Sequence, residues 1–103
     1  MTALEARLDR LAMEGETMTY GALARDLGLR IGALTAELER LMERDFAMGH
    51  PLRAALCAGR LSGGLPAPGF FAKAADLGYR MDDPAEFAAK QRAALHQRAI
   101  SRA

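Results

Sequence analysis

Residues 20–29 read Tyr20-Gly21-Ala22-Leu23-Ala24-Arg25-Asp26-Leu27-Gly28-Leu29, and this stretch decides the fold. It stands near the start of residues 17–48, whose pattern predicts a short helix, a tight turn and a long amphipathic helix. Ala24 is small enough for two helices to approach closely, Gly28 can take the positive φ of a turn, and Leu34 returns the second helix to the first. This spacing predicts a helix-turn-helix.

The composition is typical of a small helical domain. The chain has 103 residues, 50% of them hydrophobic, with no tryptophan and 6% aromatic residues, which predicts one core of leucine, alanine and methionine. A single cysteine excludes an internal disulfide. The sequence shows neither a secretory signal nor an apolar run of about 18 residues. We therefore expect a cytoplasmic protein with no membrane partner.

Charge is unevenly distributed although the net charge is only +1. Residues 1–50 contain six arginines and nine acidic residues, whereas residues 51–103 contain eight lysines and arginines and four acidic residues. The basic half could meet phosphate or an acidic partner. It could equally be a solvated face that balances the acidic half of the same molecule.

Local signals predict a first helix from about Ala3 to Glu14, because Thr2 and Glu5 have capping-box spacing. Its apolar face is formed by Leu4, Leu8 and Leu11. The long helix from Ile31 has the strongest apolar stripe of the chain, formed by Leu34, Leu38, Leu41, Met42 and Phe46. We interpret residues 1–48 as a three-helix core.

The pattern changes period after Pro51, which ends the long helix. Leu52, Ala54 and Leu56 alternate with the residues between them, which predicts a short strand with one face on the core. Glycine-rich residues 60–64 then predict a turn. Residues 49–67 are thus interpreted as the strand and minimal β wing of a winged helix.

Residues 68–103 are predicted to be a C-terminal helical extension. One helix should end at Gly78, and a last helix should begin at Asp83, followed by Pro84 and Glu86. The last helix is expected to bury Phe87, Ala94 and Leu95. The predicted fold class is therefore mostly α (α+β), one winged-helix-like domain over residues 1–103 with a helix-turn-helix, a minimal wing and additional C-terminal helices.

Low-specificity binding of duplex DNA is the first functional hypothesis. The start of the second helix of a helix-turn-helix enters the major groove, where Arg30 and Thr35 are the side chains able to read base edges. Near the predicted wing, Arg53, Arg60 and Lys73 are the candidate phosphate contacts. The glutamates of the same long helix would face phosphate, so we expect little sequence specificity.

Three motifs follow one another along residues 17–64. They are Thr19-Tyr20-Gly21-Ala22-Leu23-Ala24, then Ile31-Gly32, then His50-Pro51 ahead of a predicted strand. This order resembles the winged-helix domain of O6-alkylguanine-DNA alkyltransferases and of the non-enzymatic alkyltransferase-like proteins. The resemblance implies a winged-helix fold that binds duplex DNA.

The alkyl-accepting motif of that family, Pro-Cys-His-Arg, is altered in this chain. Alignment on His50-Pro51 places Cys57 at the proline, Ala58 at the nucleophile, Gly59 at the histidine and Arg60 at the arginine. Cys57 also lacks an adjacent histidine to take its proton. The resemblance therefore implies a non-enzymatic relative. Residues 65–71 are similar to a stretch in small uncharacterised bacterial proteins, which implies no activity.

A protein-interaction or assembly module on the same scaffold is the alternative function. Phe70, Phe71 and Tyr79 would form an interaction patch for a partner protein or a homodimer if they were exposed. The other interpretation is that the last helix covers them through Phe87 and Leu95.

No other chemistry is predicted. His50 and His96 lie far apart without neighbours at metal-ligand spacing, which argues against a metal site. The pair Asp82-Asp83 is explained by helix capping rather than by acid–base catalysis. We expect no catalytic residue, no cofactor and no small-molecule substrate.

Overall fold

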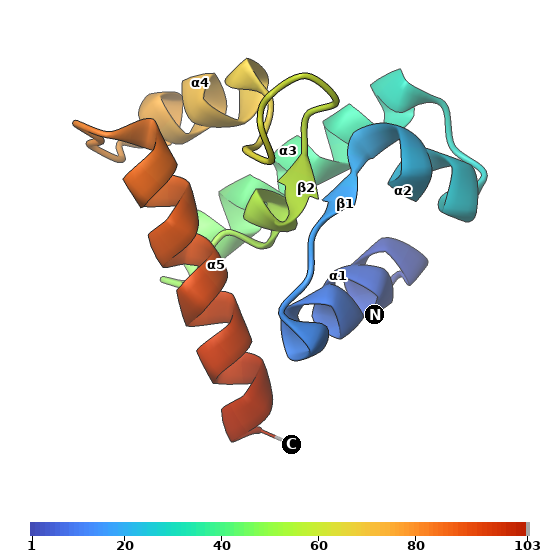
Figure 1. Ribbon diagram of the computed structural model, residues 1–103, viewed down its shortest axis with the longest axis horizontal. Helices are drawn as coiled ribbons and strands as arrows, with labels where there is room; N and C mark the ends of the chain where they lie inside the picture. The colour runs from blue at the N-terminus through green and yellow to red at the C-terminus, as the bar shows by residue number, and fades with distance from the viewer. Residues whose placement is uncertain (103) are drawn as a thin grey trace.

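The computed structural model describes residues 1–102, so Ala103, the last residue of the predicted domain, lies outside the described residues. Most of the described chain is helical, as predicted (Figure 1). The elements in chain order are α1 (Ala3–Glu14), β1 (Met18–Thr19), α2 (Tyr20–Leu27), α3 (Ile31–Ala47), the 3₁₀ helix η1 (Arg53–Leu56), β2 (Cys57–Ala58), α4 (Pro68–Leu77) and α5 (Pro84–Ser101).

Helix ends lie where local chemistry predicts them. At the start of α1, the Thr2 hydroxyl accepts from the Glu5 amide and the Glu5 carboxylate accepts from the Thr2 amide, which completes the capping box. Gly28 ends α2 with φ of 67°. The Asp83 side chain accepts from two amides in the first turn of α5. These predictions are confirmed.

The predicted strand over residues 52–56 is wrong. Arg53–Leu56 forms η1, and the strand β2 consists only of the two residues that follow it. β2 pairs in parallel with β1, in the register Met18 to Cys57 and Thr19 to Ala58. Figure 1 shows these two strands side by side. Because the only sheet within residues 1–102 is this parallel pair, residues 49–67 form no β hairpin of their own, and the minimal β wing predicted there is not confirmed.

η1 lies at the centre of the packing because it contacts α1, α3 and α5. Ala54, Ala55 and Leu56 are all buried, so the apolar alternation did not mark one buried face of a strand. A short segment enclosed by helices on several sides buries consecutive residues whatever its secondary structure. This enclosure is the physical reason for the wrong strand assignment.

The helices bury most of the positions predicted for the core. Leu34, Leu38, Leu41 and Met42 of α3 are buried, as expected. Phe46 is 43% exposed, because it lies at the end of α3. In α5, Leu95 is buried, Phe87 is half-buried and Ala94 is exposed, so the prediction for Ala94 is wrong. Among residues 1–102, no helix combines the length and the apolar content that a bilayer crossing requires.

Two glycines provide a matched test of the turn between α2 and α3. A Cβ atom at Gly28 or at Gly32 would meet no other atom within 4 Å, but only Gly28 has positive φ. Gly28→Ala should therefore lower the free energy of unfolding by about 1 kcal/mol through backbone strain. Gly32→Ala should raise it by about 0.5 kcal/mol, because alanine favours a helix. Urea unfolding followed by circular dichroism measures both, and changes of the same sign would contradict the proposed turn.

Candidate functional site

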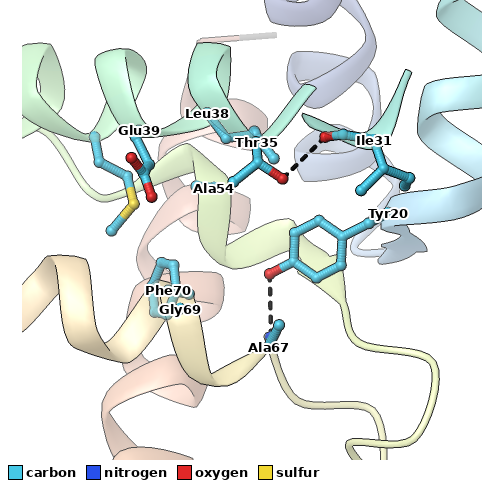
Figure 2. Close-up of a pocket in the computed structure, with 10 residues that line it drawn as sticks. Tyr20, Ile31, Thr35, Leu38, Glu39, Ala54, Ala67, Gly69 and Phe70 are labelled. Atoms are coloured by element: carbon cyan, nitrogen blue, oxygen red, sulfur yellow. Dashed lines mark hydrogen bonds between the residues drawn. The ribbon is translucent and has the colours of Figure 1, made fainter. Parts of the chain in front are cut away.

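An apolar groove lies between α3 and the start of α4, with a volume of about 220 Å³. Its walls come from α2, α3, η1 and the residues that begin α4. The lining residues are Tyr20, Ile31, Thr35, Leu38, Glu39, Met42, Ala54, Ala67, Gly69 and Phe70. Figure 2 shows the α3 residues along one side of the groove, with Tyr20 and Phe70 opposite them.

Tyr20 connects the start of α2 to the segment just before α4. It is the first residue of α2, immediately after the N-cap Thr19. Its hydroxyl accepts a hydrogen bond of 3.1 Å from the Ala67 amide, which lies just before α4 (Figure 2). Burial raises the pKa of the Tyr20 phenol, so the hydroxyl stays protonated at neutral pH. The start of α4 is thereby held across the groove from α3.

One face of α3 forms the longest wall of the groove. The lining positions of this helix are Ile31, Thr35, Leu38, Glu39 and Met42, at helical spacing. Ile31 is 52% exposed, and the Thr35 hydroxyl donates to the Ile31 carbonyl at 3.0 Å. Among the described residues 1–102, Glu39 is the only charged one that lines the groove. The groove is thus open and apolar, with one carboxylate in its lining.

Of the five residues predicted to contact DNA, Arg53 and Lys73 form ion pairs within the molecule. Arg30 is exposed immediately before α3, and Arg60 is exposed in the loop after β2. Thr35 lines the groove. Lys73 forms an ion pair of 2.6 Å with Glu43, whose hydrogen bond raises the pKa of the lysine.

Arg53 is held inside the molecule by two carboxylates. Its Nη2 atom lies 2.7 Å from Oδ1 of Asp45, and its Nη1 atom lies 3.1 Å from Oε2 of Glu5. Asp45 is only 1% exposed and also accepts from the Arg53 amide at 3.0 Å. These contacts occupy the guanidinium and leave it less available for phosphate, so the phosphate contact of Arg53 stays a prediction.

Burial opposes the positive charge of Arg53, but the adjacent carboxylates outweigh it. The net effect of burial and of the bonds to Asp45 and Glu5 is to raise the pKa of Arg53. Glu5 has a lowered pKa, first because the Thr2 amide donates to it and further because Arg53 and Arg44 lie nearby. Arg53 and Glu5 therefore both remain charged at neutral pH.

The predicted interaction patch is largely covered. Phe70 is buried at 5% exposure, while Phe71 and Tyr79 are half-buried. The ring of Tyr79 packs edge-on against Phe87 of α5, with centroids 5.4 Å apart. It also packs against Phe46 at 5.3 Å. These contacts match the interpretation in which the last helix covers the aromatic residues.

Sequence reasoning missed the groove as a site. Phe70 is its only lining residue that the sequence placed in an interaction patch, and Thr35 was assigned to DNA instead. The available signal was the run of Ile31, Thr35 and Glu39 at four-residue intervals, next to the main apolar stripe of α3. These three residues form a second face of α3, but their spacing does not show which segment of the chain lies opposite that face.

The lone thiol is unsuited to nucleophilic chemistry. Cys57 is fully buried, and burial raises its pKa to about 12, so almost none of it is thiolate at neutral pH. Residues 1–102 also contain no group of three or more side chains that could hold a metal ion.

Comparisons with models of known protein families, with curated proteins and with solved structures found no match to this chain. The resemblance to the alkyltransferase winged helix stays a hypothesis that rests on the motifs between residues 17 and 64.

The contacts of Glu5 predict a pH-dependent contribution to stability. Its pKa is lowered from 4.5 on folding, so its contribution is present above pH 4.5 and is lost as the pH falls through its folded pKa. Glu5→Gln should lower the free energy of unfolding at pH 7, and the difference from the unmodified protein should shrink in acid. Urea unfolding between pH 3 and pH 7 measures this.

Glu37→Gln is the matched control for the Glu5 experiment. It removes the same charge from a residue that forms no ion pair within residues 1–102. A Glu5 effect that is independent of pH, or equal to that of Glu37→Gln, would contradict the proposed role of the ion pairs.

Proposed function

We propose that this protein is a non-enzymatic interaction module that holds an apolar segment of a partner protein in the groove along α3. The observation that carries this proposal is the open apolar groove itself, which is lined by Tyr20, Ile31 and Phe70. Ile31 is 52% exposed, and leaving its side chain facing water forgoes roughly 25 cal/mol for each Å² of apolar surface. A partner that covers the groove recovers that free energy.

The shape of the groove fits a helical segment of the partner. One wall is a single helix, α3, and the opposite wall is formed by Tyr20 and the start of α4. Grooves between helices commonly hold the apolar face of an amphipathic helix, which inserts anchor side chains three and four residues apart. The volume of about 220 Å³ suits such anchors.

Glu39 specifies the charge of the partner. It is the only charged residue of the groove, and its carboxylate forms no ion pair within residues 1–102. A lysine or arginine beside the apolar anchor would compensate this charge. The partner segment is therefore apolar with a basic residue at its edge.

Duplex DNA is the second candidate, favoured by two exposed arginines. Arg30 and Arg60 form no ion pair with a carboxylate within residues 1–102. The winged-helix resemblance supports the same candidate. The loss of Arg53 and Lys73 to internal carboxylates, and the position of Glu39 on α3, make a phosphate-binding surface less favourable than the apolar groove. The single cysteine suits the reducing cytoplasm under either candidate.

Site-specific photo-crosslinking tests the interaction proposal. A benzophenone amino acid replaces Ile31 in one variant and Met48 in another, where Met48 is 77% exposed but does not line the groove. In cells that express the protein, we expect a discrete heavier adduct from position 31 and none from position 48. Glu39→Arg should lower the yield at position 31 by roughly fivefold, because it repels the basic residue of the partner.

Glu37→Arg is the control for the charge reversal, since Glu37 lies on the same helix outside the groove. No adduct at position 31, or equal adducts at both positions, would contradict the proposal. An adduct of twice the mass of the chain would show a homodimer instead of a separate partner.

A duplex titration separates the two candidates. The interaction proposal predicts no binding of a labelled duplex at about 50 mM salt, measured by fluorescence anisotropy. DNA binding would instead weaken steeply as salt rises, and Arg30→Gln with Arg60→Gln would lower the salt slope by about two. Arg98→Gln with Arg102→Gln is the matched control for net charge. Salt-dependent binding that only the first pair reduces would favour DNA.

A further inference from the structure

A second pocket, distinct from the groove, lies between the end of α1 and the middle of α5. Its volume is about 230 Å³. It is lined by Ala12, Gly15, Glu16, Thr17, Leu56, Arg92, Ala93 and His96. The apolar side chains among these form part of the wall, and the charged or titratable ones are Glu16, Arg92 and His96.

Arg92 is a half-buried cation that forms no ion pair with a carboxylate within residues 1–102. Its Nε donates to the Ala55 carbonyl at 2.7 Å, which fixes the guanidinium against η1. Its Nη2 is buried and has no hydrogen-bond acceptor within residues 1–102. Burial lowers the pKa of Arg92, and no carboxylate is among the groups that offset this effect. Buried charges and buried N–H groups are normally paired, so this guanidinium lacks a partner.

Arg53 is a second half-buried arginine of this fold, and two carboxylates compensate its positive charge. Both arginines are half-buried. Arg53, the first residue of η1, bonds two carboxylates, whereas Arg92 bonds only the neutral carbonyl of Ala55 in η1. The pKa of Arg53 is raised and that of Arg92 is lowered, which reflects the presence and the absence of a negative partner. An anion would supply the negative partner that Arg53 has and that Arg92 lacks.

We propose that the pocket beside Arg92 binds a small monocarboxylate, whose oxygen atoms accept from the guanidinium while its apolar body contacts Leu56 and Ala93. The Thr17 hydroxyl is a further donor in the lining. His96 is fixed in the wall because its Nδ1 donates to the Ala12 carbonyl at 2.8 Å. Glu16 in the lining repels any anion, but it repels doubly charged phosphate more than a singly charged carboxylate, which favours the carboxylate.

Titration with sodium butyrate tests this site. We expect saturable changes in the amide NMR signals of Gly15, Glu16 and Thr17 at pH 7, with sodium chloride at equal ionic strength as the reference. Inorganic phosphate should bind more weakly. Arg92→Gln should weaken butyrate binding by roughly tenfold or more, because it removes a charge-assisted hydrogen bond. Arg98→Gln removes an equal charge from the exposed side of the same helix and should leave binding unchanged.

Glu16→Gln keeps the test valid if Arg92→Gln does not fold. Glu16 is exposed, and its neutralisation should tighten butyrate binding by roughly twofold to fivefold. No saturable change with butyrate, or a Glu16→Gln variant that binds no more tightly, would overturn the proposal. Tighter binding of phosphate than of butyrate would overturn the carboxylate assignment. None of these outcomes depends on the apolar groove.

Discussion

The contact between Asp45 and Arg53 is the constraint on which the arrangement of the helices depends. Asp45 is 1% exposed, and a carboxylate so deeply buried is stable only if its partner is in place. Arg53 meets it with a backbone amide, Nε and Nη2, and reaches Glu5 with Nη1. These bonds join the end of α3 and the neighbouring η1 to the start of α1, which is distant in sequence, and so fix the relative position of the three elements.

Fixing η1 also positions both candidate sites. Ala54 lines the apolar groove, while the carbonyl of Ala55 holds Arg92 and the side chain of Leu56 lines the second pocket. Consecutive residues of one short helix therefore face two different cavities. A segment buried on several sides can do this because it has no solvent-exposed face, which is also why its apolar pattern resembled a strand.

Structural features that depend on neighbouring residues could be predicted from the sequence. Features that depend on contacts between residues far apart in the chain could not. The ends of α1, α2 and α5 were predicted because Thr2, Gly28 and Asp83 act within their own turns. The parallel pairing of β1 with β2 joins residues far apart in the chain, and no local pattern encodes it. The groove is assembled from four segments, so Tyr20 and Ile31 could not be recognised as its walls before the fold was known.

The uneven charge of the two halves has a structural explanation. Arg53 of the basic half bonds Asp45 and Glu5 of the acidic half, and Lys73 bonds Glu43. Part of the excess charge of each half is therefore paired within the molecule. A count of charges along the sequence cannot separate such internal partners from ligands for phosphate. What distinguishes an arginine with a ligand-binding role is a partly buried guanidinium that forms no bond to a carboxylate. By that criterion Arg92, which the sequence did not single out, is a stronger candidate than Arg53, which it did.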